Sequence, residues 1–363
     1  MQENSTTTAS GFLSLIRGKH VVYITVKNKD YIRTTQIRRL LEKETSRYEM
    51  YTSEKGNPLT RALELRRLIG KIDLSDADVV ILGFLPQLLI SSLGKELTKG
   101  ACSTGKRPVI VAEMFLSLYD TVILDRHLFE DGKKLSAYLR KMDKKTIEAA
   151  DLVVTDTKAN ADYLALLYEA DEGKFETLYL EADKEIYTPR STDADKVVKE
   201  IESLGTGNDE GSTDKKKCKV LYFGSGLPLQ GTDVVLEAFN RVRAESDDFS
   251  FLFVGGLKGI PRSEIKKAKA DSGIELTDWL LQEDLAVKIA KADLCIAGHF
   301  NAYIGKADRT IPGKAYIYEL MKKPMILGDT RANREIFSED RRHFFVKRGS
   351  PEELAECIKR FQL

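Results

Sequence analysis

The sequence has few of the features that mark secreted, membrane-spanning or metal-binding proteins. Its four cysteines stand alone with no Cys-x-x-Cys spacing, which is typical of free thiols in a reducing cytoplasm. No stretch approaches the roughly 20 apolar residues that a membrane span needs. Residues 1–8 lack the basic start of a signal peptide. His20 and His343 have no companions at metal-ligand spacing, so we expect a cytoplasmic protein without a metal or other cofactor.

The chain also has little excess charge of either sign. Its 57 Lys and Arg residues nearly balance 56 Asp and Glu residues, so the net charge of +1 gives no general electrostatic argument for binding nucleic acid. A basic triplet, Lys215 to Lys217, is most simply a solvated loop. Contact of that triplet with anionic lipid stays open, and with it a peripheral position at the inner face of a membrane.

The pattern of apolar runs divides the chain into two similar halves. At 363 residues it exceeds what one core usually holds. Short apolar runs alternate with helical periodicity in both halves, which predicts parallel α/β sheets. The expected buried strands are 19–26, 78–83, 107–112, 151–155, 219–223, 249–254, 274–277, 293–298 and 324–327. We expect a polar extension (1–17), a first Rossmann-like domain (18–190), a flexible linker or insertion (191–217) and a second Rossmann-like domain (218–363), facing each other across a cleft.

The stretch from Ala292 to Asp329 carries the strongest functional signal. It is expected to form a strand, a long loop, a helix that begins near Pro312, and another strand. Ligands of open parallel sheets bind beyond the carboxyl ends of the strands, where this loop and helix start would lie. There Lys314 and the helix dipole would favour phosphate, while Glu319 would grip a ribose. His299, just past its strand, is also expected in the site.

Glycine turns and cations complete the predicted donor site. Gly224, Ser225 and Gly226 follow one strand, and Gly255 and Gly256 follow the next, which permits close approach of backbone to a phosphate. Downstream, Lys306, Arg309 and Lys314 lie within nine residues of one another and can neutralise a departing diphosphate. The alternative is a solvated loop.

Candidates for a second substrate lie in the first half. Glu113, Asp120, Asp125 and Arg126 follow the strand that ends at Ala112, and an acid there can orient or deprotonate an acceptor hydroxyl. Tyr31 and Arg33 lie in the turn after the first strand and are expected to face the same cleft. The single tryptophan, Trp279, is interpreted as a core or rim residue rather than a stacking platform.

With these residues in place, nearly the whole chain resembles glycosyltransferase family 4, the retaining nucleotide-sugar enzymes of the GT-B fold. The resemblance rests on an ordered set of segments: 222–238, 277–285, 292–295, 311–314, Glu319, 328–330 and Glu335 in the second half, and 117–121, 125–126, 150–157 and 182–189 in the first. It implies transfer of a sugar from a nucleotide-diphosphate donor, in the second domain, to a hydroxyl of a glycan or lipid-linked glycan, in the first. It also implies retention of configuration in cell-envelope or capsular polysaccharide assembly.

The chain departs from the family pattern at three places. The lysine position of the glycine loop is Gln230, the first member of the paired-glutamate motif is Ile311, and the first-domain histidine is replaced near Glu113. We infer that Lys306 and Arg309 take over the phosphate contacts, with Glu113 and Asp120 as the catalytic acids. Two alternatives stay open: a nucleotide-sugar epimerase, and a non-catalytic GT-B partner of another glycosyltransferase.

Overall fold

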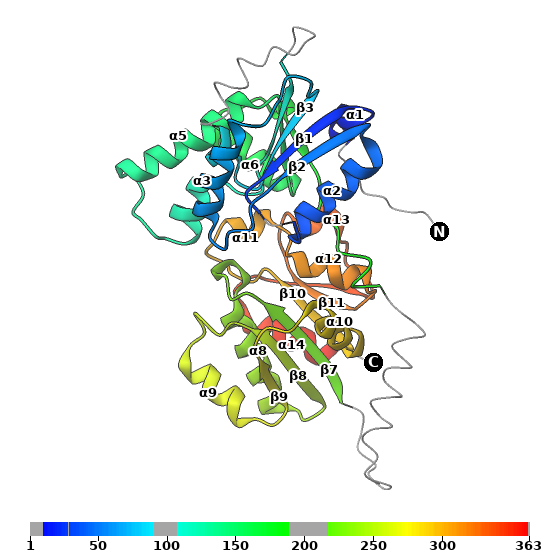
Figure 1. Ribbon diagram of the computed structural model, residues 1–363. Helices are drawn as coiled ribbons and strands as arrows, with labels where there is room; N and C mark the ends of the chain where they lie inside the picture. The colour runs from blue at the N-terminus through cyan, green and yellow to red at the C-terminus, as the bar shows by residue number, and fades with distance from the viewer. Residues whose placement is uncertain (1–9, 28, 91–106, 189–216, 362–363) are drawn as a thin grey trace. The chain divides into compact units, whose positions relative to one another are not determined.

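The computed structural model describes residues 10–27, 29–90, 107–188 and 217–361, and the chain falls into two compact units, Met1–Glu181 and Ala182–Leu363 (Figure 1). Residues 191–216, most of the expected linker and two of the three basic residues Lys215 to Lys217, lie outside the described residues. Within the described part, no helix has the length and apolar character that crossing a membrane requires.

The first unit contains a parallel six-stranded sheet in the order β2-β1-β3-β4-β5-β6. The strands are β1 (His20–Thr25), β2 (Arg47–Tyr51), β3 (Val79–Gly83), β4 (Val109–Glu113), β5 (Leu152–Thr155) and β6 (Phe175–Thr177). The helical elements are α1 (Ser10–Ile16), α2 (Ile32–Glu44), α3 (Pro58–Ile69), the π-helix η1 (Asp120–Asp125), α5 (Lys134–Ala149), α6 (Lys158–Tyr168) and the 3₁₀ turn η2 (Glu172–Lys174).

Side chains that alternate along the strands build a separate core on each face of this sheet. Val22 and Ile24 of β1 pack in one cluster with side chains of α3, α5 and α6. Val21 and Tyr23 pack in the other with side chains of α1 and α2. Every residue of β1 is buried, as expected for a parallel strand covered on both faces.

The second unit has a parallel six-stranded sheet in the order β12-β11-β10-β7-β8-β9. Its strands are β7 (Cys218–Gly224), β8 (Phe249–Gly255), β9 (Ile274–Thr277), β10 (Leu294–Gly298), β11 (Met325–Gly328) and β12 (His343–Val346). Its helices are η3 (Pro228–Gln230), α8 (Thr232–Glu245), α9 (Arg262–Ala270), α10 (Gln282–Lys291), α11 (Lys306–Arg309), α12 (Gly313–Leu320), α13 (Asn333–Ile336) and α14 (Pro351–Arg360). The prediction of parallel α/β sheets is confirmed in both units.

The structure differs from the sequence prediction at the start of the chain. Residues 10–16, expected in a polar extension, form α1, whose Phe12 and Ile16 are buried against the first sheet. The Glu176 carboxylate accepts hydrogen bonds from the backbone N–H groups of Gly11 and Phe12, at 2.7 and 2.5 Å, and so caps the helix. A carboxylate 165 residues away in sequence supplies the cap, so no local pattern could have indicated it.

Candidate functional site

The carboxyl edge of the second sheet brings most predicted donor residues together. Gly224 and Gly255 end neighbouring strands and are paired in register, so the two glycine turns lie side by side. A Cβ at position 255 would lie 2.0 Å from the carbonyl oxygen of Gly224, and the φ of +120° there is open only to glycine. Ser225 is exposed between these turns, while Gly226 and Gly256 are half-buried and in backbone contact. Backbone, not side chains, forms this surface.

Lys314 lies at the start of α12 and is 95% buried. Its Nζ atom lies 3.9 Å from the centre of the Tyr222 ring and makes no hydrogen bond to any residue that the structure describes. Burial lowers the pKa of this lysine well below its ordinary value. An ammonium group so placed lacks a counter-anion, and its charge would be stabilised by a ligand that brings one.

His299 follows β10 and lies near Lys314 and two other cations. It is buried, and its Nδ1 atom has no hydrogen-bond partner among the described residues. Burial lowers the pKa of His299 to about 3, so the ring is neutral at pH 7. Three cations act in the same direction, namely Lys314, Lys306 and Arg348. These three basic side chains therefore surround a neutral His299 ring with positive potential at one edge of the sheet.

Local packing fixes the remaining predicted donor residues. Gln230 accepts a hydrogen bond from the Tyr222 hydroxyl at 3.1 Å and donates one to Ser225 Oγ at 3.2 Å, which ties the glycine turn to its own strand. Ala307 of α11 packs against Leu229 of η3, so α11 lies beside the turn that follows the glycines. Lys306 is half-buried there, whereas Arg309 is buried against Gly305. The two predicted phosphate-binding cations thus differ in access to solvent.

Glu319 corrects the sequence prediction. It lies in the last turn of α12, and its carboxylate accepts hydrogen bonds from Arg342 at 3.1 and 3.2 Å. Its other contact is His343 Nε2 at 2.8 Å, and His343 is the first residue of β12. Because β12 is parallel to its neighbour, this pair lies at the amino edge of the sheet, opposite the glycine turns. The prediction that Glu319 lies at the ligand-facing end of its helix is therefore wrong.

At the carboxyl edge of the first sheet, Arg33 and Glu113 form a buried ion pair. Arg33 Nε lies 2.8 Å from the Glu113 carboxylate, and both side chains are about 98–99% buried. The guanidinium also donates to Gln36 at 2.9 Å and to the Leu178 carbonyl at 2.6 Å. Desolvation raises the pKa of Glu113, and Arg33 opposes that rise. The pair joins β4, α2 and the segment after β6, and neither side chain is exposed to a substrate.

Aromatic rings lie beside this pair. Tyr31, which precedes α2, contacts Phe84 and Phe115 edge-on, with ring centres 5.5 and 6.3 Å apart. Lys27 Nζ lies 4.6 Å from the centre of the Tyr31 ring and 4.5 Å from that of Phe84. Tyr31 is partly exposed. Phe84, Phe115 and Lys27 were missed because single apolar or cationic residues after strands carry no pattern.

The predicted acids after β4 lie on a buried π-helix. Asp120 and Asp125 are its two ends and both are buried, with the Tyr163 hydroxyl donating to Asp120 at 3.4 Å. Arg126, next along, is exposed. The segment before the π-helix is fixed by Asp143 of α5, whose carboxylate accepts from Ser117, Tyr119 and other groups at 2.7–3.0 Å. No local pattern indicated Asp143, because an acid inside a helix usually faces solvent.

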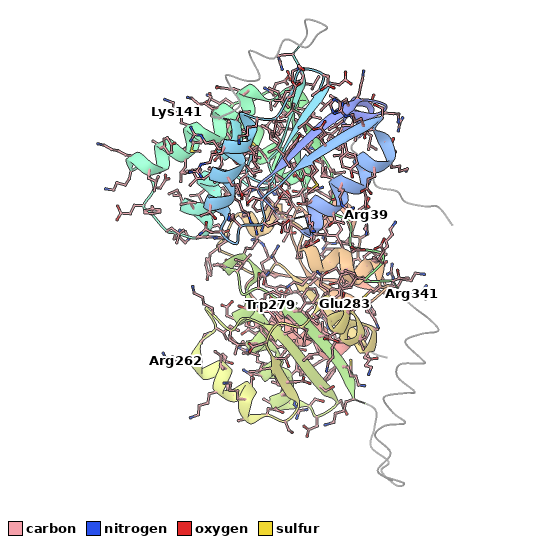
Figure 2. The ribbon with its side chains drawn as sticks, in the orientation of Figure 1. Arg39, Lys141, Arg262, Trp279, Glu283 and Arg341 are labelled. Carbon is pink, nitrogen blue, oxygen red and sulfur yellow. The ribbon has the colours of Figure 1, made fainter. Side chains whose placement is uncertain are left out.

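Two further results concern Trp279 and metals. Trp279 lies two residues beyond β9 and is 64% exposed, so it is a surface residue and not part of the core (Figure 2). Arg348, missed from the sequence, follows β12 and donates to the Asn301 carbonyl at 3.0 Å. Over the described residues, no three His, Cys, Asp or Glu side chains cluster as metal ligands.

Comparison with solved structures identifies the architecture. Anabaena HepE in complex with UDP is 12% identical, with 94% of this chain and 89% of that chain covered at a TM-score of 0.58. The catalytic domain of starch synthase IV from Arabidopsis thaliana bound to ADP and acarbose is 11% identical. The match covers 94% of this chain and 91% of that chain, at a TM-score of 0.61. The fold is GT-B. A glycosyltransferase from Rickettsia africae shares it, at 14% identity, 94% and 87% coverage and a TM-score of 0.61.

A family model adds information on the second unit of this GT-B chain. Residues 217–362 match the family described as Glycosyl transferases group 1. That span contains both glycine turns, Lys306, Lys314 and Arg348. None of the curated proteins compared with the chain matches it.

Proposed function

We propose that this protein is a glycosyltransferase that moves a sugar from a nucleotide-diphosphate donor to a hydroxyl of a glycan or lipid-linked glycan. The second unit would bind the donor and the first the acceptor. The match of residues 217–362 to group 1 glycosyl transferases supports the reaction class. Retention of configuration and a place in cell-envelope or capsular polysaccharide assembly are carried over from the sequence resemblance.

One observation carries the donor assignment: the buried Lys314 Nζ has no hydrogen-bond partner among the described residues and lies beside a surface made of glycine backbone. A diphosphate supplies the missing negative charge and fits where side chains are absent. Lys306 and Arg348 add positive charge around the neutral His299 ring. As the glycosidic bond to the donor breaks, negative charge grows on the departing diphosphate, and these fixed cations stabilise it. No metal is needed for that step in this proposal.

The acceptor would enter at the carboxyl edge of the first sheet. Tyr31 offers a partly exposed ring and hydroxyl there, and Arg126 an exposed cation. Asp120 and Asp125 are buried on the adjoining π-helix, so in this proposal they act as positioning residues beneath the acceptor and not as groups that touch it. Glu113 acts in this proposal through Arg33, as a positioning residue beneath the site.

A direct test uses the full-length protein and a panel of UDP-, GDP- and ADP-sugars. A donor present at about 100 times its Kd should stabilise the fold by about 2.7 kcal/mol, seen as a rise in Tm. Release of nucleoside diphosphate on addition of a glycan acceptor would then show transfer. If no nucleotide sugar raises Tm, the donor site is not where we place it.

One observation favours a second candidate function, a non-catalytic GT-B partner of another glycosyltransferase. Gln230 replaces the family's lysine and is already hydrogen-bonded to Tyr222 and Ser225, and Ile311 and Glu319 leave no carboxylate at the donor edge of α12. This candidate predicts weak affinity for the donor and no turnover. Enzymatic release of diphosphate by the purified protein would exclude it.

A further inference from the structure

The first unit carries a basic and apolar surface, of which the proposed function uses only Arg126 and the end of η1. It spans residues 124–145: the end of η1, the loop that follows, and the first three turns of α5. Figure 1 shows α5 on the outside of this unit, and Lys141 projects from it in Figure 2. We call this region the 124–145 surface.

Large apolar side chains are exposed on it. Leu128 is 58% exposed, Phe129 54% and Tyr138 58%, and Leu124 and Leu135 are also exposed. Single exposed apolar side chains are common, but several within 15 residues leave a contiguous apolar area facing water. Such an area marks a surface that contacts a partner or a membrane. The nearby Tyr119, Ile123 and Leu139 form a small buried cluster, so the exposed side chains stand on a packed base.

The loop that presents Leu128 and Phe129 is fixed to the helix. Asp131 accepts hydrogen bonds from Ser136 Oγ of α5 at 2.5 Å and from the Tyr119 hydroxyl at 3.0 Å. The backbone N–H of Leu128 donates to the Val122 carbonyl of η1 at 3.0 Å. Arg140 lies 4.8 Å from the centre of the Tyr119 ring. These contacts hold the loop and the start of α5 as one rigid surface.

The charges on this surface are strongly one-sided. It has seven exposed basic side chains and two exposed acids, although the whole chain is nearly neutral. Of its acids, Asp125 and Asp143 are buried. The exposed bases are Arg126, Lys133, Lys134, Arg140, Lys141, Lys144 and Lys145.

We propose that the 124–145 surface docks on an anionic lipid bilayer, with its apolar side chains entering the interface and its lysines contacting headgroup phosphates. Leucine and phenylalanine beside lysines match the interface between hydrocarbon and anionic headgroups. A second copy of the chain fits poorly, because a symmetric contact would press two basic surfaces together. This proposal does not depend on the sugar chemistry, and it assigns membrane contact to a region other than Lys215 to Lys217.

Co-sedimentation of the full-length protein with vesicles tests the proposal. We expect binding to phosphatidylcholine vesicles that contain phosphatidylserine, weak binding to phosphatidylcholine alone, and a decrease in binding as salt rises. Lys134→Glu/Lys141→Glu should weaken binding by at least about 25-fold, from about fivefold for each charge lost. Leu128→Ser should weaken it by about fivefold.

Matched variants elsewhere in the same unit provide the controls. Leu166→Ser removes a leucine of α6 that is even more exposed, at 82%, and Lys43→Glu/Lys71→Glu reverses two exposed charges outside the surface. Both should bind vesicles like the wild type, and circular dichroism should show every variant folded. Equal binding to neutral and anionic vesicles, no vesicle binding, or equal losses in test and control variants would overturn the proposal. The rise in Tm on addition of a nucleotide sugar is measured in the same variants. It should match that of the wild type, so a loss of vesicle binding can be told apart from a loss of donor binding.

Discussion

At the scale of single residues, the buried charge of Lys314 is the feature with the most consequence. An ammonium without a counter-anion is unstable in an apolar site, and here burial lowers the pKa of the group instead of a partner neutralising it. An anionic ligand would restore the charged form. Lys314 therefore links nucleotide binding to both stability and protonation.

Replacing Lys314 should move stability and binding in opposite directions. In Lys314→Met the apolar side chain keeps the packing on Tyr222 but removes the cost of burying an amine, so the ligand-free protein should unfold at a higher Tm. Nucleotide affinity should fall about tenfold or more, because a charged hydrogen bond of roughly 1.5–3 kcal/mol is lost. Calorimetry and thermal unfolding measure both, with Lys288→Met on the exposed face of α10 as the control. Unchanged affinity in Lys314→Met would contradict the site.

Nucleotide binding should also take up a proton. The pKa of Lys314 lies well below its ordinary value of 10.5, so the unfolded chain binds the proton more tightly than the folded one. Stability of the ligand-free protein therefore rises with pH from the lowered folded pKa towards 10.5. A bound diphosphate raises that pKa, so affinity should fall as pH rises above the folded value. Titrations in buffers of different ionisation enthalpy should give different apparent enthalpies, and the difference should vanish in Lys314→Met.

Loss of the buried ion pair between Arg33 and Glu113 should lower the free energy of unfolding more than loss of an exposed pair. Glu113→Gln would leave the Arg33 guanidinium buried without its counter-charge, which costs about 3–5 kcal/mol of unfolding free energy. Urea denaturation measures the change. Glu237→Gln, in an exposed pair with Arg241 at 2.8 Å, should change stability by under about 1 kcal/mol. A loss of similar size in both variants would show that the buried pair has no special role.

At the scale of elements, α12 has two ends with different tasks. Its start places Lys314 beside the glycine turns, whereas its last turn places Glu319 against Arg342 and His343 at the amino edge of the sheet. Burial raises the pKa of Glu319, but hydrogen bonds from His343 and Arg342 outweigh it and lower the pKa. The hydrogen bond to Glu319 raises the pKa of His343 in turn.

These shifts give Glu319→Gln a defined pH dependence. The stabilisation from His343 is fully present below its ordinary pKa of 6.5 and is lost as pH rises through its raised value. The stabilisation from the Glu319 carboxylate is lost as pH falls through the lowered pKa of that group, which lies below its ordinary value of 4.5. Glu319→Gln should therefore lower the free energy of unfolding most between pH 4.5 and pH 6.5. The loss should be about 1 kcal/mol or less, because the carboxylate is partly exposed. Nucleotide affinity should not change, and a tenfold loss of UDP binding would instead restore Glu319 to the donor site.

At the scale of the whole molecule, each unit has its own sheet and its own core clusters. The second unit holds all the residues that we assign to the donor. We expect a fragment of residues 182–363 to fold alone and to bind UDP or a UDP-sugar within about tenfold of the full-length affinity, because the site's charges all lie within it. Cooperative thermal unfolding and calorimetry test this. A fragment that folds but does not bind would show that the first unit contributes to the donor site.

Local sequence patterns were sufficient for the architecture and for part of the site. Apolar runs bounded by glycine predicted β7, β8 and β10, and the glycine turns, Lys306, Lys314 and His299 were predicted at one edge of a sheet because parallel strands end on the same side. The short strands β2 and β6 were not predicted, since half-buried runs such as Arg47–Tyr51 carry polar side chains and little periodicity.

Only the tertiary structure decided which charged groups have partners. Glu319 was predicted to be free for a ribose because nothing near it in sequence explains it, yet its partner His343 lies 24 residues away. Arg33 reaches the Leu178 carbonyl across 145 residues, and Glu176 caps α1 across a similar separation. Secondary structure follows from periodicity between near neighbours, which the sequence contains. Burial and ion pairing depend on segments that meet only when the sheet forms, so the sequence alone could not determine them.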